Sequence, residues 1–535
     1  MEKAVDMGKT SVKGSFQLFI GRIVSTLVLA VGTIVVGMYI SDIEYGLYTI
    51  ALVPAATFLL FQDWGVSTAL TKYCANYRAE KKEAELRTMI ISGLTFEVLT
   101  GIALTLFSFL TASFVASTIF GNSESAFLVA LASITIFFSA IYGGSLSVFV
   151  GFERMGLSTV SLIVSSAVQG LLSPLLVYLG FGAIGAVAGF TVASIASGVT
   201  GVFLLYFSIF RKLPSAKVSK ARLFQTLKPL LRYGIPLSIA TIISGISTQI
   251  YYFLMASYAD LAMIGNYRIA SNFALFLSFF IFPIQTVLFP AFSKLNPSKD
   301  RQLLKTVFAS SIKYSSLFLV PATIALMVLS TPMITAIYGE KWLTAPFFLT
   351  LSVVGNVLVL LGNISVNRLL YAMGETRMLM KLSTLTLCIG VPLAFLLIPP
   401  LGVLGVIIVS SLVAGVPSMS IGIYWTWRRY ETKPDLRNSA RIFLASVVAG
   451  VTTYLFLNIF TGVAWIMLAG GTIFFLTVYL ISMPLFGAVS QVDIANLRTM
   501  FSGLGPIAIL LNIPLVIVEK PLKFKNRHAS ISEQK

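Results

Sequence analysis

The sequence predicts an all-α, polytopic membrane protein that crosses the bilayer about fourteen times. Three observations support this fold class. The 535 residues are 57% hydrophobic and only 11% charged, whereas soluble domains carry about 25% charged residues. Long apolar runs reach the roughly 20 residues that span a bilayer as a helix. Short motifs also recur in the two halves at a nearly constant separation, which is typical of duplicated transporters.

The apolar runs are far longer than the strands of membrane barrels. We therefore expect helices, which satisfy their own backbone hydrogen bonds in lipid. The predicted spans cover residues 15–40, 47–71, 88–113, 126–150, 156–179, 182–210, 233–256, 261–290, 309–336, 344–371, 378–398, 402–427, 439–460 and 463–485.

An internal repeat groups the first twelve spans into two copies of six. Gly46-Leu47-Tyr48 returns as Gly265-Asn266-Tyr267 at an offset of 219 residues, and Gly182 returns as Gly402 at an offset of 220. Six is even, so both copies enter the membrane from the same side, as parallel repeats do. The expected parts are an N-terminal lobe at 1–210, a basic cytosolic linker at 211–232, a C-terminal lobe at 233–429, two further helices at 430–485, and a cytosolic amphipathic segment with a basic tail at 486–535.

The basic excess follows membrane topology. The net charge is +18, and most of the 38 Lys and Arg residues fall in cytosolic segments or at their edges if the N-terminus is cytosolic. This is the positive-inside pattern, and it predicts a protein of the cell (cytoplasmic) membrane with both termini in the cytosol. Anionic lipids, rather than nucleic acid, are the expected partners of the basic loops.

Enzyme chemistry has little support in the sequence. The two Cys and the single His form no metal-binding cluster, and no Gly-rich phosphate loop of the nucleotide-binding type is present. We therefore expect no catalytic residues, metal or cofactor.

The C-terminal region has a different pattern. Ile494, Leu497 and Phe501 follow helical spacing, which predicts a helix on the inner membrane surface. The apolar stretch within residues 504–518 is broken by Pro514 and is too short to span comfortably, so we expect it to be interfacial or re-entrant.

Three charges inside the first half lie at one depth. Arg22, Asp63 and Glu97 fall on three consecutive predicted spans, each roughly 14 Å from the cytosolic flank. Charged groups at this depth normally face a partner or a cavity. Two interpretations stay open for Asp63 and Glu97, a coupling-ion site and an ion network with Arg22 that only orders the helices.

The second half carries Arg268 about 12 Å from the outer face. Asn266, Tyr267 and Asn272 surround it in sequence, and it has no acidic neighbour in its own predicted helix. This pattern favours a substrate-binding role for Arg268 and its polar neighbours. Arg368 lies about one turn from the cytosolic end of its span, so we expect its side chain to reach back to the interface.

Several motifs together resemble the polysaccharide exporters of the O-antigen flippase type, within the multidrug/oligosaccharidyl-lipid/polysaccharide exporter superfamily. The resemblance covers nearly the whole chain. The matching motifs, in order, are Gly46-Leu47-Tyr48, Asp63-Trp64-Gly65-Val66-Ser67-Thr68-Ala69-Leu70, Tyr233-Gly234-Ile235-Pro236-Leu237, Gly265-Asn266-Tyr267, Pro290-Ala291-Phe292-Ser293, Tyr338-Gly339 and Leu401-Gly402-Val403-Leu404-Gly405.

The resemblance implies two six-helix lobes around a central cavity and flipping of a polyprenyl-(di)phosphate-linked glycan, with glycan assembly enzymes as further partners. Related lipid II flippases carry cationic cavity residues on helices one, two and eight. Arg22 and Arg268 match the first and last of these. Asp63 occupies helix two instead, so specificity for lipid II does not transfer.

Three other functions stay open. A cation-coupled small-molecule or drug antiporter of the same superfamily typically stops at twelve helices. A membrane glycan polymerase or ligase would need a large outer loop, whereas the longest predicted outer loops have only about ten residues. A lipid scramblase without glycan selectivity is the third.

Overall fold

The computed structural model describes residues 2–214, 219–460, 462–502, 512 and 514–519, and within them it contains helices and no strand. The predicted all-α membrane fold is confirmed. Nine helical segments of this described part are long and apolar enough to cross a membrane, or up to eleven if each of two bent pairs is one span. One of the nine, Met155–Lys212, holds 58 residues in two successive helices. The total of about fourteen spans stays a prediction.

Packing divides the chain into two compact units. Unit 1 comprises Met1–Arg268 and Val391–Val406, and unit 2 comprises Ile269–Gly390 and Ile407–Lys535. The divisions fall inside helices α9 (Leu261–Ala274), α15 (Thr376–Leu401) and α16 (Val403–Ile407). The repeat-based lobes, which meet at the 211–232 linker, stay a prediction.

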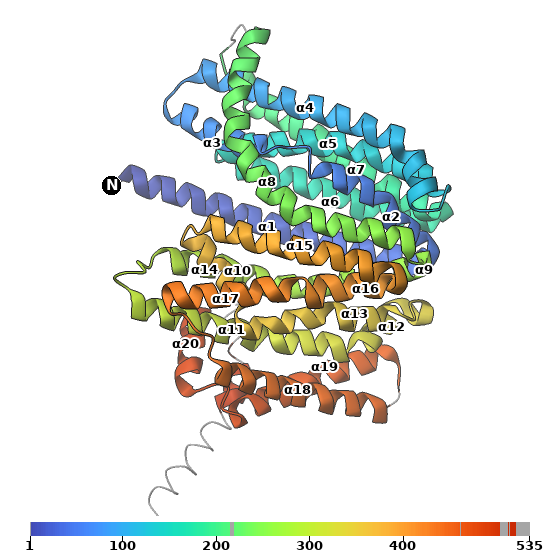
Figure 1. The fold of residues 1–535 in the computed structure, drawn as a ribbon, viewed down its shortest axis with the longest axis vertical. Coiled ribbons are helices and arrows are strands. Elements are labelled where there is room, and N and C mark those ends of the chain that lie inside the picture. The colour runs from blue at the N-terminus through green and yellow to red at the C-terminus, as the bar shows by residue number, and fades with distance from the viewer. Residues whose placement is uncertain (1, 215–218, 461, 503–511, 513, 520–535) are drawn as a thin grey trace, which may run out of the picture. The chain divides into compact units, whose positions relative to one another are not determined.

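Unit 1 is built around pairs of long helices. Within it, α4 packs on α5, α5 on α7, and α6 on both α1 and α7 (Figure 1). Its helices are α1 (Glu2–Tyr39), α2 (Asp42–Leu59), α3 (Val66–Ala79), α4 (Glu83–Phe114), α5 (Ser125–Gly151), α6 (Met155–Leu176), α7 (Gly182–Ser208), α8 (Lys220–Tyr258), the start of α9, the end of α15 and most of α16.

The second predicted span is interrupted. The sequence predicts one helix over residues 47–71, but α2 ends at Leu59 and α3 begins at Val66. Trp64 and Gly65 between them have φ angles of 46° and 75°, which no right-handed helix accommodates. The Asp63 carboxylate then accepts a 2.7 Å hydrogen bond from the backbone N–H of Ser67 in the first turn of α3, as a helix-capping group does.

Unit 2 contains a second sharp bend. Residues Ala345–Leu361 and Asn363–Ala372 meet at 60°, and Gly362 at the bend has φ 91°. Its helices include α10 (Ser278–Ser293), α11 (Arg301–Val328), α12 (Ser330–Tyr338), α13 (Ala345–Val354), the 3₁₀ segment Gly355–Leu361, α14 (Asn363–Ala372), α17 (Gly415–Tyr430), α18 (Leu436–Ile459), α19 (Ala464–Leu485) and α20 (Gln491–Ser502). Within the unit, α11 packs on α18, α18 on α19, and α10 on α14.

The C-terminal helix α20 docks onto unit 2. Ile494 and Leu497 are each 2% exposed, so the predicted apolar face is buried against protein. Asp493 on the same helix is also buried, and Lys313 of α11 lies 2.6 Å from its carboxylate. The expected interfacial or re-entrant segment at 504–518 lies mostly outside the described residues, as does the basic tail at 520–535.

Candidate functional site

The repeated Gly-x-Tyr motifs meet in space. A Cβ atom built on Gly46 of α2 would lie 2.1 Å from the carbonyl oxygen of Leu261 in α9. A Cβ atom built on Gly265 would lie 2.1 Å from the carbonyl oxygen of Asp42 and 3.2 Å from the backbone nitrogen of Gly46. Only glycine permits so close a backbone approach. The contact places the Tyr48 ring near the side chain of Arg268, three residues beyond Gly265.

Arg268 lies among tyrosine side chains of unit 1. Its guanidinium carbon is 5.9 Å from the centroid of the Tyr48 ring, and it contacts the Tyr45 and Tyr48 hydroxyls, with Tyr252 nearby. The Tyr45 and Tyr48 rings are stacked 5.7 Å apart. The Arg268 Nε is buried and makes no hydrogen bond. Among the described residues no carboxylate pairs with Arg268, so neutral oxygens and aromatic faces alone surround its charge.

The other predicted binding residues have different surroundings. Asn266 is 5% exposed, and its amide donates a 2.8 Å hydrogen bond to the carbonyl of Ala262 in its own helix. Tyr267 and Asn272 are half-buried on α9. Arg22 lies on an exposed part of α1, the helix that packs on α6. A shared substrate site for these residues stays a prediction.

Two acidic side chains of unit 1 come together. Glu97 of α4 is fully buried and accepts hydrogen bonds from the Gln62 amide and from the Ser67 hydroxyl at 3.1 Å. The Asp63 carboxyl contacts that of Glu97. The break between α2 and α3 produces this arrangement, because it turns Gln62 and Asp63 toward α4. The joint cluster with Arg22 stays a prediction.

Two further motifs that carry the family resemblance, those that contain Gly65 and Gly234, also contact each other. A Cβ atom built on Gly65 would lie 2.3 Å from the carbonyl oxygen of Gly234 in α8. Beside this contact, the Lys72 ammonium lies 3.9 Å from the centroid of the Tyr233 ring, a favourable cation–π distance. These contacts attach α8 to α3.

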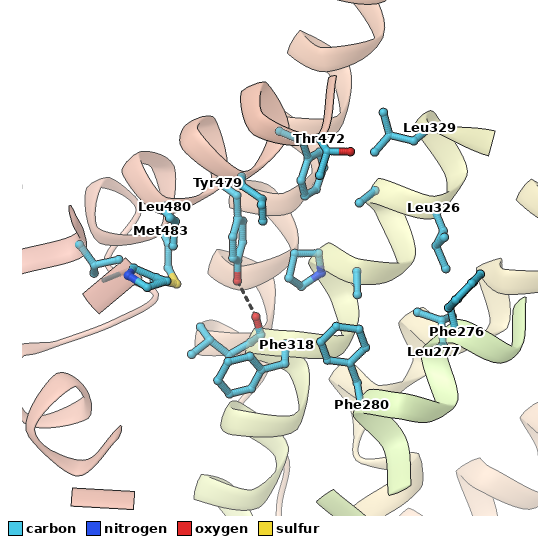
Figure 2. Close-up of a pocket in the computed structure, with 18 of the residues that line it drawn as sticks. Phe276, Leu277, Phe280, Phe318, Leu326, Leu329, Thr472, Tyr479, Leu480 and Met483 are labelled. Carbon is cyan, nitrogen blue, oxygen red and sulfur yellow. Dashed lines mark hydrogen bonds between the residues drawn. The ribbon is translucent and has the colours of Figure 1, made fainter. Parts of the chain in front are cut away.

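An apolar pocket of about 500 Å³ lies in unit 2 between α11, α19 and neighbouring segments. Figure 2 shows Phe280 and Phe318 on one side of it and Thr472 and Tyr479 on the other. The Tyr479 hydroxyl donates a 2.8 Å hydrogen bond to the carbonyl of Leu317, so this polar group already has a hydrogen-bond partner within the protein. The pocket therefore suits a hydrocarbon chain rather than a polar ligand.

Sequence reasoning missed the immediate partners of the predicted charges. Tyr45 and Tyr48 contact Arg268, and Gln62 and Ser67 contact Glu97. Tyr48 could have been found, because it belongs to the repeated motif that includes Gly46. The other three have no distinctive spacing.

Comparisons with known proteins match the chain to a protein family and to individual relatives. The family model described as polysaccharide biosynthesis protein matches residues 15–346. The lipopolysaccharide biosynthesis protein WzxC of Escherichia coli is 25% identical over 333 residues, 60% of this chain and 62% of WzxC. The chain thus spans less than two thirds of that relative. The uncharacterized membrane protein MJ1068 of Methanocaldococcus jannaschii is 22% identical over 391 residues, 69% of this chain and 75% of MJ1068.

Two solved structures share the fold. The lipid II flippase MurJ in an inward closed conformation superposes with a TM-score of 0.70 at 19% identity, covering 89% of this chain and 98% of MurJ. An inward-facing multidrug resistance MATE family transporter of the MOP superfamily gives a TM-score of 0.61 at 15% identity, covering 75% and 94%. The resemblance seen in the sequence motifs is confirmed.

Proposed function

Because the chain belongs to the polysaccharide biosynthesis protein family, we propose that it flips a polyprenyl-linked oligosaccharide from the inner to the outer leaflet of the cytoplasmic membrane by alternating access. The observation that carries the proposal is Arg268, a cation between apolar helices with no carboxylate partner among the described residues. The names of WzxC and MurJ, a lipopolysaccharide biosynthesis protein and a lipid II flippase, agree with this class of substrate.

The proposed substrate explains why the charged side chain of Arg268 lies among apolar membrane helices. A glycan on a diphosphate cannot cross hydrocarbon unaided, because its hydroxyls and charges would lose their hydration. A guanidinium replaces that hydration well, since its planar donors bind phosphate oxygens in pairs. In the proposal, Arg268 exchanges its tyrosine contacts for the diphosphate. Arg22, Asn266, Tyr267 and Asn272 complete the polar lining.

Alternating access requires α2 and α9 to separate and close again. The glycine contact supports this step, because two backbones that meet without side chains can seal tightly. When they part, Arg268 loses its contacts with Tyr45 and Tyr48 on α2 and becomes available to the substrate. Closure of the same pair would then restore those contacts and release the substrate.

The lipid tail stays in an apolar environment throughout. The pocket of unit 2 lined by Phe280, Phe318 and Leu480 supports this part of the proposal, because each CH₂ group kept out of water is worth about 0.8 kcal/mol. A polyprenyl chain seated there would remain in contact with both protein and lipid.

Asp63 and Glu97 provide a candidate coupling site. Two carboxyl groups in contact repel each other when both are ionised, and a proton or Na⁺ between them removes the repulsion. The same pair favours the second candidate function, a cation-coupled small-molecule antiporter. The two functions differ in substrate, so glycan transport in a purified system separates them.

Orientation and partners follow from the charge distribution. The positive-inside pattern supports cytosolic N- and C-termini and basic cytosolic loops against anionic lipids. Enzymes that assemble the glycan on the inner leaflet and consume it on the outer leaflet are the expected functional partners.

The test replaces Arg268 in a strain that depends on this protein for its surface polysaccharide. Arg268→Ala should abolish surface glycan and accumulate lipid-linked glycan on the inner leaflet, with normal protein abundance in the membrane. Arg377→Ala, at an exposed arginine of α15, is the matched control and should export normally. Wild-type glycan levels in Arg268→Ala cells would rule out the substrate role.

A further inference from the structure

A polar cavity lies in unit 2, apart from the candidate site residues described above. It measures about 450 Å³ and lies between α10, α11, α14, α15, α17 and the 3₁₀ segment Gly355–Leu361. This volume is within the roughly 300–1,000 Å³ typical of small-ligand pockets. The polar side chains that matter for its chemistry are Gln285, Asn356, Asn363, Asn367, Arg368 and Thr386.

The bend at Gly362 builds this cavity. The 60° change of direction allows Asn356 on the 3₁₀ segment and Asn363 and Asn367 on α14 to line one space. Asn363 and Asn367 are four residues apart and so share a helix face. Gly362 needs its left-handed φ of 91°, and a Cβ atom there would lie 2.7 Å from Ile312 Cδ1. The fold therefore fixes three amides around one volume.

Arg368 supplies the only cation among the described residues that line the cavity. Its side chain is half-buried, its guanidinium donates a hydrogen bond to the Gln285 side-chain oxygen, and its carbon lies 5.9 Å from the Tyr371 ring centroid. Its expected reach toward the membrane interface stays a prediction, and the structure shows that it lines this cavity. Within the described part of the chain it has no carboxylate partner.

The arrangement matches one class of ligand. Primary amides donate and accept hydrogen bonds at once, as pairs of sugar hydroxyls require. An unpaired guanidinium in a protein interior is stabilised by a bound carboxylate or phosphate. A diphosphate that is esterified at both ends carries two negative charges at neutral pH, one on each phosphate, whereas a carboxylate carries one, equal and opposite to the single cation. One cation beside three neutral amides thus fits an acidic sugar better than the lipid diphosphate.

We propose that this cavity binds an acidic sugar residue of the translocated glycan, with its carboxylate on Arg368 and its hydroxyls on Asn356, Asn363 and Asn367. The inference rests on the proposed function and deepens it, because it assigns a substrate class. Gln285 holds the guanidinium in the cavity before the sugar arrives.

The test measures binding of small probes to the purified full-length protein by calorimetry. Methyl β-D-glucuronide should bind roughly tenfold or more tightly than methyl β-D-glucoside, since a charge-assisted pair is worth about twice a neutral one. Arg368→Gln should remove this preference, and Asn367→Ala should weaken both sugars alike. Arg377→Gln, an exposed arginine outside the cavity, is the matched control and should keep the preference.

Three results would overturn the assignment. They are equal affinity of the wild-type protein for both sugars, an unchanged preference in Arg368→Gln, and inorganic pyrophosphate that binds more tightly than the glucuronide and depends on Arg368. The last result would assign the cavity to the diphosphate. If Arg368→Gln does not fold, Arg368→Lys tests the planar donor pair instead, because it keeps the charge. It should reduce the glucuronide preference without removing it, and an unchanged preference would contradict paired recognition by the guanidinium.

Translocation assays keep the two proposals separate. Equal affinity of the wild-type protein for both sugars, together with intact lipid-linked glycan transport, would overturn the acidic-sugar site alone. Absence of transport by the wild-type protein, together with a preference that depends on Arg368, would overturn the proposed function and leave the site standing.

Discussion

Gly46 of α2 and Gly265 of α9 face each other across a backbone contact so close that a Cβ atom on Gly265 would lie 3.2 Å from the Gly46 nitrogen. These two glycines occupy the same position in the two copies of the internal repeat. The two copies of the duplicated motif thus contact each other. Arg268 lies one turn along α9 from this contact, so separation of α2 and α9 would directly change its surroundings.

The first prediction concerns this contact. Gly265→Val should reduce glycan export strongly, because the added methyl groups meet the Asp42 carbonyl and hold the helices apart. Overpacking of this kind costs about 1–3 kcal/mol. Surface glycan and membrane abundance should be measured together. Gly470→Val in α19 is the control, since a Cβ atom there has no neighbour closer than 3.9 Å, and export equal to that control would contradict the sealing role.

The second prediction concerns Arg22. Arg22→Ala should abolish surface glycan if its side chain faces the translocated headgroup. Combining it with Asp63→Asn or Glu97→Gln distinguishes the alternative, because a structural ion network is restored when its charges balance again. Export assays of the single and double variants suffice. Recovery in a double variant would assign Arg22 to helix ordering rather than to the substrate.

The third prediction concerns the carboxyl pair. Glu97→Gln should leave a folded protein whose flipping in liposomes no longer responds to an imposed proton or Na⁺ gradient. The amide oxygen can still accept the hydrogen bond from Gln62, its NH2 group can donate to the Ser67 hydroxyl, and the charge is lost. Thr100→Val, one turn along α4 where the hydroxyl bonds only its own helix, serves as the control. A gradient response equal to wild type in Glu97→Gln would exclude this pair from coupling.

The sequence was sufficient for features that depend on composition and spacing. Apolar runs predicted the helical membrane fold, and the repeat predicted that Gly46 and Gly265 are equivalent. The sequence alone did not predict which side chains of distant helices contact one another. Arg368 and Gln285 are 83 residues apart, and nothing local distinguishes an arginine that lines a cavity from one at the membrane interface.

Breaks within the predicted helices were the second feature that the sequence alone did not reveal. The sequence predicts one span through residues 60–65, yet Trp64 and Gly65 adopt left-handed backbone angles. Gly65 packs closely against Gly234, and this partner lies 169 residues away in the sequence. The position of Asp63 beside Glu97 follows from this break, and the depth argument from the sequence did not reveal their contact.

The fourth prediction concerns pH and the docking of α20. Burial alone would raise the pKa of Asp493, but hydrogen bonds from Lys313 and Ser490 outweigh it and hold the pKa below its usual value. The pair therefore stabilises the docked helix fully above about pH 4, the usual Asp value, and this stabilisation disappears as pH falls through the lowered folded-state pKa.

Hydrogen exchange of residues 491–502 measures this docking. Asp493→Asn should increase exchange at neutral pH, by a destabilisation of about 2 kcal/mol typical of a lost charge-assisted hydrogen bond. Asp260→Asn, an exposed aspartate that precedes α9, should leave exchange unchanged. Equal protection of α20 in both variants would show that the buried Ile494 and Leu497 suffice without the ion pair.

The fifth prediction tests the apolar pocket of unit 2 as the seat of the lipid tail. Ala322→Phe adds a ring to a pocket-lining position of α11 and should reduce glycan export several-fold, because a filled pocket cannot hold the polyprenyl chain. Tyr479→Phe is the matched control, since it removes the hydrogen bond to Leu317 and keeps the pocket volume. A shorter prenyl carrier should be less affected by Ala322→Phe than a long one, because it places less chain in the pocket. Equal loss with both carriers would mean that the added ring acts on protein stability, and the tail would then have to travel elsewhere.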